Sequence, residues 1–396
     1  MHLILMSRHV KLIPHTQPLR KSDDRSHRRY LNALAAKLNI MLLYDLACAP
    51  DNRAGHERWF MTGDDFRDER HVMKALRRCG HTVEPFGLYN DLTPLLEKLN
   101  GMRPNVVFNM CESFSNSRHH EADVMSVLEM LGIAHTGASA EALNLCKDKA
   151  LSKKIVSFHG ISIPRFAVIM PPQTGLRPNH RNPTKPELFS DDAKDQLKTL
   201  KWPAICKPLD RDSSEGISKS SVVSNSASCL RHIAHLQKTF RRGVIVEEFI
   251  PGRELYIGMV ELPGQKKLLV LPPRELYVGT GPGFVTWRAK WDKTYRSRHG
   301  IDSGRAKKID VSVLHRLEQI AREAFHALEL SGYARLDLRL RDNGDPVFIE
   351  ANPNPSIRRG DDFAAAAHAA GIGYDDLIEG IVKTAMLRHN RNKQAA

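Results

Sequence analysis

The sequence predicts an α/β protein with α+β regions, in which a parallel, doubly wound sheet comes first along the chain. Strand-like and helix-like segments alternate over residues 40–109, as they do in parallel sheets with crossover helices. Strands and helices resume in a mixed order after a proline-rich stretch at residues 171–201. With 396 residues, of which 41% are apolar, the chain can form two or three packed domains without disulfides or a structural metal.

The N-terminal region contains the alternating elements. The predicted order of strand, helix, strand, helix and strand is Ile40–Asp45, Phe66–Cys79, Thr82–Phe86, Leu92–Leu99 and Val106–Phe108. Gly80 and Gly101 are expected to end the two helices. Ligands of parallel sheets bind at the carboxyl ends of the strands, so we expect loops 45–63 and 110–120 to border a binding site.

The rest of the chain predicts shorter elements around an inserted surface loop at 171–201. Helices are predicted at Glu121–Leu131, Lys149–Phe158, Asp192–Leu200, Ser312–Leu330, Asp361–Ala370 and Asp375–Leu387. Strands are predicted at Arg165–Met170, Leu255–Val260, Lys267–Val270, Tyr333–Leu340 and Val347–Glu350, with further strands and a helix within residues 204–249.

The net charge of +14 is concentrated at the two ends of the chain. Residues 1–40 carry +6 and residues 383–396 carry +4, so the segment between them is nearly balanced. This distribution does not favour a nucleic-acid partner, because the core is nearly balanced and the basic ends lack interleaved aromatic residues. No apolar run reaches the roughly 18 residues of a membrane span. Six cysteines without a CxxC pair fit a reducing cytoplasm.

The last strand pair predicts a β-hairpin with a metal site on one face. Asn343-Gly344 is a strong signal for a two-residue turn, and this register places Asp337 directly opposite Glu350. The two carboxylates repel each other unless a cation lies between them. Asn352 lies on the same face as Glu350. These oxygen donors favour Mg²⁺ or Mn²⁺ together with substrate phosphates, and the alternative is an exposed hairpin face without an ion.

Two further segments contain the residue types that hold a nucleotide. Lys207 ends a strand and precedes a Ser- and Gly-rich turn at 210–218, where a point charge and backbone N–H groups can bind phosphate. The apolar strand 244–250 leads into a Pro-Gly turn; its main chain can contact an adenine edge, and Glu254 can bind ribose hydroxyls. Each segment alone is also compatible with an ordinary strand and loop.

Taken in order, these segments resemble the ATP-grasp superfamily and, within it, the D-alanine–D-alanine ligase group. The resemblance covers about Ile40 to Leu387 and includes the stretches 129–137, 146–154 and 350–355. It implies a Rossmann-like N-terminal domain followed by two α+β subdomains that sandwich ATP. The implied boundaries are a basic, disordered extension at 1–39, the N-terminal domain at 40–145, the central subdomain at 146–250, the C-terminal subdomain at 251–387 and a basic tail at 388–396.

The resemblance also implies roles for individual residues. The ATP-binding residues would be Lys149, Lys207, Ser213, Ser214, Gly216, Glu247, Phe249, Ile250, Glu254 and Lys290. The metal ligands would be Asp337, Glu350 and Asn352, which would hold two Mg²⁺ (or Mn²⁺) ions. The catalytic residues would be Arg335, Ser213 and Lys290, of which Arg335 would stabilise an acyl phosphate and the tetrahedral oxyanion.

The chain departs from the family pattern where substrates would bind. Trp291 stands where the D-alanine ligases have a tyrosine, and the Gly-rich loop after the third strand is replaced. Both substrate pockets are therefore expected to be altered. The candidate substrate residues are Glu112, Arg118, Arg358 and Arg359, with Glu57 as a second candidate for holding an ammonium group. The arginines could bind an extra substrate carboxylate, or they could be surface residues near a cleft.

The function that the resemblance implies is ATP-dependent ligation of a carboxylate to an amine, giving a peptide or amide bond through an acyl phosphate. The alternatives are an ATP-grasp kinase or phosphotransferase and a non-catalytic nucleotide-binding protein. The expected partners are small molecules, an amino acid or other carboxylate and an amine. A membrane or a nucleic acid is not expected, since the basic ends contain Tyr30 as their one aromatic residue. A homodimer is compatible with this function.

Overall fold

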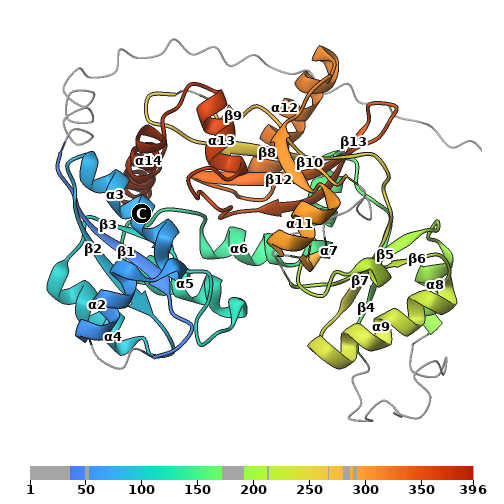
Figure 1. Cartoon of the computed structure of the whole chain (residues 1–396), viewed down its shortest axis with the longest axis horizontal. Helices are drawn as coiled ribbons and strands as arrows, with labels where there is room; N and C mark the ends of the chain where they lie inside the picture. The colour runs from blue at the N-terminus through green and yellow to red at the C-terminus, as the bar shows by residue number, and fades with distance from the viewer. Residues whose placement is uncertain are drawn as a thin grey trace, which may run out of the picture. The chain divides into compact units, whose positions relative to one another are not determined.

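The computed structural model describes residues 36–49, 53–171, 191–211, 214–265, 267–279, 286–288 and 292–395 (Figure 1). Most of the predicted N-terminal extension and of the predicted insertion therefore lies outside the described residues. Residues 38–396 form one unit, and its described part contains three β-sheets. Within these ranges no helix combines the length and the hydropathy that crossing a membrane requires.

The first sheet is parallel, as predicted, with the strand order β2-β1-β3. Its strands are β1 (Asn39–Asp45), β2 (Thr82–Leu88) and β3 (Val106–Met110). β1 lies in the middle, and residues 40–44 of this apolar strand are all buried. The helices of this region are α2 (Arg53–Thr62), α3 (Arg67–Arg78), α4 (Thr93–Met102), α5 (Glu121–Met130) and α6 (Ala140–Lys147).

Two features of this region differ from the prediction. Residues 45–63, expected to be a loop, contain helix α2, whose Phe60 ring stacks on Tyr44 with the centroids 5.0 Å apart. The hydrophobic pattern of the sequence did not predict α2, because the large apolar residues of this helix are all near its C-terminal end. Helix α4 extends beyond Gly101, its predicted end. It ends at Arg103, which adopts the left-handed conformation at φ 46°.

The second sheet is antiparallel, with the order β4-β7-β5-β6. Its strands are β4 (Phe166–Ile169), β5 (Ala204–Pro208), β6 (Val222–Val223) and β7 (Val244–Glu248). Helices α8 (Asp191–Lys198) and α9 (Ser226–Phe240) share one apolar cluster with these strands and cover one face of the sheet (Figure 1). Helix α7 (Lys149–Phe158) is capped by Asp148, whose carboxylate accepts the N–H groups of Ala150 and Leu151, both at 2.9 Å.

The third sheet has the order β11-β10-β8-β12-β13, with β9 paired to β8. Its strands are β8 (Arg253–Val260), β9 (Leu269–Val270), β10 (Arg274–Tyr277), β11 (Asp302–Arg305), β12 (Tyr333–Leu340) and β13 (Pro346–Asn352). The helices of this region are α11 (Lys293–His299), α12 (Val311–Ala327), α13 (Asp362–Ala369) and α14 (Tyr374–Ala395). β12 is buried between β8 and β13, so its polar residues are held in fixed positions.

β12 and β13 form the predicted hairpin, but with a different turn. Asp337 pairs with Glu350, as predicted. Beyond this pair the register shifts by one residue, because Ile349 forms a β-bulge. A loop closed by the Arg341 N–H donating to the Asp345 carbonyl at 3.0 Å replaces the two-residue turn. The longer loop and the bulge each change the register by one residue, and the two changes cancel at the Asp337 pair.

A buried ion-pair network joins α7, the second sheet and this hairpin. The carboxylate of Glu247, which is 1% exposed, lies 2.8 Å from Nζ of Lys153 and 2.9 Å from Nζ of Lys207. Lys153 also donates to the carbonyl of Ile349, the bulged residue, at 2.5 Å. Burial by itself raises the pKa of Glu247, but the two ammonium groups outweigh burial and lower this pKa to about 2.

Helix α14 extends beyond its predicted end, so that residues 388–395, predicted as a basic tail, are its last turns. The Arg388 guanidinium donates to the carbonyls of His135 and Gly137, each at 2.9 Å, and to the Ser331 hydroxyl. These bonds attach the helix to the segment that follows α5 and to the segment that precedes β12.

Arg388→Ala is expected to lower the free energy of unfolding by about 2–3 kcal/mol, because it leaves half-buried carbonyl groups without a charged donor. Urea unfolding followed by circular dichroism measures the change. Arg391→Ala, on an exposed position one turn further along α14, is the control and should change stability by less than about 0.5 kcal/mol. Equal losses in the two variants would contradict the anchoring role of Arg388.

Glu247→Gln is expected to cost about 3–5 kcal/mol at pH 7, because it leaves two buried ammonium groups without a counter-charge. The pKa of Glu247 is lowered in the fold, so its contribution is complete above its ordinary pKa of 4.5 and is lost as pH falls toward 2. The stability gap between wild type and Glu247→Gln should therefore narrow between pH 5 and pH 2. Glu248→Gln, at the next and more exposed position, should show neither effect.

Candidate active site

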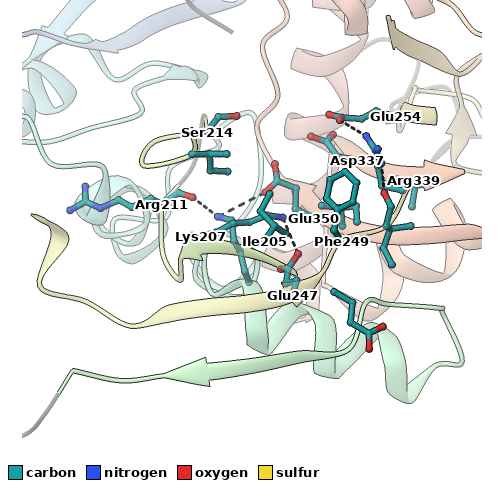
Figure 2. Close-up of a pocket in the computed structure, with 16 residues that line it drawn as sticks. Ile205, Lys207, Arg211, Ser214, Glu247, Phe249, Glu254, Asp337, Arg339 and Glu350 are labelled. Atoms are coloured by element: carbon teal, nitrogen blue, oxygen red, sulfur yellow. Dashed lines mark hydrogen bonds and ion pairs between the residues drawn. The ribbon is translucent and has the colours of Figure 1, made fainter. Parts of the chain in front are cut away.

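A cavity lies where the second and third sheets meet (Figure 2). Its walls come from α7, β5 and β7 and from β8, β12 and β13, and Arg211, Ser214 and Ile217 also line it. Nine of the predicted ATP and metal residues line it: Lys149, Lys207, Ser214, Glu247, Phe249, Ile250, Glu254, Asp337 and Glu350. Segments that are far apart in the sequence therefore contribute to one site.

Two lysines bring positive charge to this cavity from rigid elements. Lys149 stands in the first turn of α7, donates to the carbonyl of Arg211 and has its Nζ 3.9 Å from Oε2 of Glu350. Lys207 stands on β5 and is held in position by Glu247. Both side chains are almost completely buried apart from their approach to the cavity. Ammonium groups held in this way are suited to bind phosphate oxygens.

The carboxylate of Asp337 is bound by Arg335, its neighbour on the same face of β12. Arg335 Nε lies 2.6 Å from Oδ1 of Asp337, and Nη2 lies 2.9 Å from Oδ2. Burial raises the pKa of Asp337 to about 6; Arg335 opposes this change, whereas the negative charge of Glu350 adds to it. The guanidinium alone therefore does not neutralise the buried carboxylate of Asp337 and the half-buried one of Glu350.

The donor set fits a divalent cation that takes oxygen ligands. Asp337 and Glu350 face each other across the hairpin, and Asn352 pairs with Arg335 one step further along. The amide Nδ2 of Asn352 is buried and has no hydrogen-bond partner among the described residues, so this donor can meet a phosphate oxygen, whereas the amide oxygen would be the atom that binds a cation. In the described ranges no group of three or more His, Cys, Asp or Glu side chains could hold a metal, so phosphate oxygens or water would complete the coordination.

The segment after β7 forms the opposite end of the cavity. Phe249 and Ile250 line it, and the Ile250 carbonyl accepts from Nε of Arg339 at 3.0 Å. Arg339 Nη1 also lies 3.0 Å from Oε2 of Glu254, the predicted ribose ligand, whose other oxygen accepts from the Tyr256 hydroxyl at 3.1 Å. The sequence analysis did not single out Arg339. The alternation of β12 identifies it, since it lies on the same face as Asp337.

The loop after β5 brings one of the two predicted serines to the cavity. Ser214 lines the cavity and has φ 62°. Gly216 does not line it but has φ 76°, and a Cβ there would approach Pro208 Cγ to 2.7 Å, so the close turn requires glycine. Ser213 and Lys290, predicted as catalytic and ATP-binding residues, lie outside the described residues.

A second cavity of about 440 Å³ lies between the first sheet region and the segment after β13. Two of the predicted substrate residues, Glu112 and Arg358, line it, whereas Glu57 does not. Glu112 lies 2.7 Å from Arg118, and Arg358 lies 2.7 Å from Asp68.

The other predicted substrate arginine, Arg359, is also engaged, since it lies over the ring of Tyr374 at 5.8 Å. Each of the three predicted arginines therefore has a partner within the protein.

One face of β12 connects the two cavities. Tyr333 lines the second cavity, Asp337 and Arg339 line the first, and Arg335 stands between them. These residues alternate along one strand, so their side chains share a face. At roughly 3.3 Å per residue, Tyr333 and Asp337 are about 13 Å apart along the strand. A ligand in the second cavity can therefore approach the guanidinium of Arg335.

Comparison with known proteins agrees with this geometry. The family described as D-ala D-ala ligase C-terminus matches residues 165–383, which is more than half of the chain. A protein of uncharacterized function from Sinorhizobium fredii is 28% identical over 81% of this chain and 88% of its own length. The D-alanine–D-alanine ligase of Gluconobacter oxydans is 26% identical over 80% of this chain and 92% of its own length.

Solved structures show the same fold. D-alanine–D-alanine ligase from Bacillus anthracis, crystallised with ATP, superposes with a TM-score of 0.63 at 20% identity and covers 90% of this chain and 99% of its own. The VanG D-Ala:D-Ser ligase from Enterococcus faecalis also has a TM-score of 0.63, at 17% identity, over 88% of this chain and 100% of its own. On the sequence match and the arrangement of the cavity residues together, the chain belongs to the D-alanine–D-alanine ligase family and is an ATP-dependent ligase with the ATP-grasp fold.

Proposed function

We propose that this ligase joins the carboxylate of one small molecule to the amine of another, forming an amide or peptide bond through an acyl phosphate. One observation carries the proposal: Lys149, Lys207, Asp337 and Glu350 converge in one cavity between two sheets, in a chain of this family. Lysines beside paired carboxylates are the arrangement that positions nucleotide phosphates and a divalent cation.

ATP occupies the first cavity in this proposal. Lys149 and Lys207 bind its phosphates, the loop with Ser214 covers them, and the main chain at Phe249 and Ile250 contacts the adenine. The ribose hydroxyls meet Glu254, which Arg339 holds in position. Asp337, Glu350 and Asn352 are the residues that would hold Mg²⁺ or Mn²⁺, which supplies charge neutralisation to the phosphates when bound.

The reaction has two steps. An oxygen of the substrate carboxylate attacks the γ-phosphorus of ATP; the new O–P bond forms as the bond to ADP breaks, and ADP leaves. The nitrogen of the neutral amine then attacks the acyl carbon. The C–N bond forms, the bond from this carbon to the phosphate oxygen breaks, inorganic phosphate leaves and the nitrogen loses a proton.

Arg335 is placed to serve both steps, because it lies between the two cavities on the face of β12. Its guanidinium can neutralise the acyl phosphate and the oxyanion that forms when the amine attacks. To do so it exchanges part of its contact with Asp337, at 2.6 Å, for the substrate. Asp337 then depends on another cation, which fits its role as a metal ligand.

The substrates of this chain are expected to differ from those of its named relatives. Those relatives are D-alanine–D-alanine ligases, but the second cavity contains Glu112 and Arg358, on segments where the sequence departs from the family pattern.

Incubation with ATP, Mg²⁺ and a carboxylate–amine pair is expected to give ADP, phosphate and an amide product in equal amounts. Mass spectrometry of the product, together with coupled phosphate release, measures this stoichiometry. A phosphorylated substrate without an amide would replace the ligase assignment with a phosphotransferase. Absence of ATP turnover with every pair tested would refute both.

Asp337→Asn and Glu350→Gln are each expected to lower kcat for ATP turnover by about 100-fold or more, because each removes charge that holds the divalent cation. Circular dichroism should show an unchanged fold. Asp342→Asn, on the exposed loop of the same hairpin, should keep wild-type activity. Unchanged turnover in Asp337→Asn or Glu350→Gln would exclude these residues as metal ligands.

A further inference from the structure

Most of the charged side chains that line the second cavity are acidic. Six carboxylate side chains line it: Asp45, Asp65, Asp68, Glu69, Glu112 and Glu121. Among the described residues that line it, Arg358 is the one positively charged side chain, and it is already bound to Asp68 at 2.7 Å. The cavity therefore carries excess negative charge inside a protein whose net charge is +14.

One of these acids is held in place by neutral groups. Asp45, at the carboxyl end of β1, accepts the N–H of Glu112 at 2.9 Å and the hydroxyl of Ser113 at 2.6 Å. Neutral donors orient a carboxylate and leave its charge in place.

Glu69 shows that the negative charge is compensated only in part, although Arg118 pairs with Glu112 and Arg358 with Asp68. Its Oε2 is buried and has no hydrogen-bond partner among the residues that the structure describes. Burial, together with the nearby carboxylates of Asp68, Asp45 and Glu112, raises the pKa of Glu69 to about 7. A buried carboxylate oxygen without a hydrogen bond costs free energy. A ligand that pairs with it removes this cost, which suggests a binding role for the carboxylate.

The arrangement of the acids favours an organic cation over a metal ion. No three or more of the acids, histidines or cysteines among the described residues lie close enough together to hold a metal. The carboxylates instead line the walls of a cavity of about 440 Å³, which is the size of a small-molecule site. The same cavity is bordered by Tyr333, which stands two residues before Arg335 on β12.

We propose that the second cavity binds a substrate that carries a further positively charged group, besides its reacting group and any α-ammonium: a basic amino acid or a diamine. This proposal rests on the ligase function proposed above and names its substrate class. It reverses the expectation from the sequence that arginines in this region bind an extra carboxylate. Glu69 and Asp45 bind the additional cation, and the reacting end of the substrate points toward Arg335.

The proposal is tested first by comparing substrates that have the same shape and differ in charge. Lysine and norleucine differ in the terminal ammonium group, and cadaverine and pentylamine form a second pair. ATP turnover is measured with each compound together with neutral, acidic and basic amino acids as co-substrates. We expect kcat/KM for lysine or cadaverine to exceed that of its neutral partner by about tenfold or more, the value of one charge-assisted hydrogen bond.

Variants connect this preference to the cavity. Glu69→Gln should raise KM for the cationic substrate by about 10- to 100-fold while it leaves KM for the neutral partner within about twofold. Because Glu69 is destabilised in the fold, Glu69→Gln should melt no lower than wild type, which separates a binding role from a structural one. Glu97→Gln, on the exposed face of α4, is the matched control and should behave as wild type.

A binding measurement gives a readout that does not depend on turnover. Isothermal titration calorimetry of wild type and Glu69→Gln with lysine, cadaverine and norleucine, in the presence of Mg²⁺ and a non-hydrolysable ATP analogue, should show tighter binding of the cations to wild type alone. Equal or better binding and turnover of the neutral partners would overturn the proposal and leave the ligase function intact. Preferential cation binding without any amide product would instead refute the proposed function and support the cation site.

Discussion

The buried carboxylate of Glu247 holds the site together, because it connects two lysines that come from different elements. Lys153 belongs to α7 and Lys207 to β5, and both lie within 3 Å of the same carboxylate. Lys153 then contacts the bulged Ile349 of β13, which is next to the candidate metal ligand Glu350. A buried ion pair is stable only when its charges are matched and its hydrogen bonds are made. The network therefore fixes the distance between the phosphate-binding side of the cavity and the metal-binding side.

The two cavities differ in charge balance, although they share one face of β12. Four basic and five acidic side chains line the first, whereas six acidic side chains and one basic side chain line the second. Lys149, Lys207 and Arg211 line the first cavity, where the phosphates of ATP would lie. Carboxylates dominate the second, and Arg335 stands at the junction. In the proposed complex, the lysines of the first cavity would face the phosphates of ATP, and the carboxylates of the second would face a cationic substrate. The net charge of +14 describes neither cavity, because it arises mainly at the ends of the chain.

Local patterns predicted much of the fold and of the nucleotide site. A short apolar run predicted β1, apolar–polar alternation predicted β12, and the order of short motifs predicted nine of the sixteen residues that line the first cavity. The pairing of Asp337 with Glu350 was also correct, but the reasoning behind it was incomplete, since the bulge at Ile349 compensates for the longer loop. Helix α2 was missed because its packing onto Tyr44, and not its periodicity, stabilises it.

The sequence by itself predicted the order of elements, the family and nine of the residues that meet in the first cavity, since these depend on periodicity and on short motifs whose residues are close together. The tertiary structure decided the partners of the arginines and the sign of the charge in the second cavity. Arg358 is bound to Asp68, and the carboxylates of Asp45, Glu69 and Glu112 come from three separate segments of the chain. Electrostatic effects depend on distance in space and on burial, and neither quantity exists until the chain has folded.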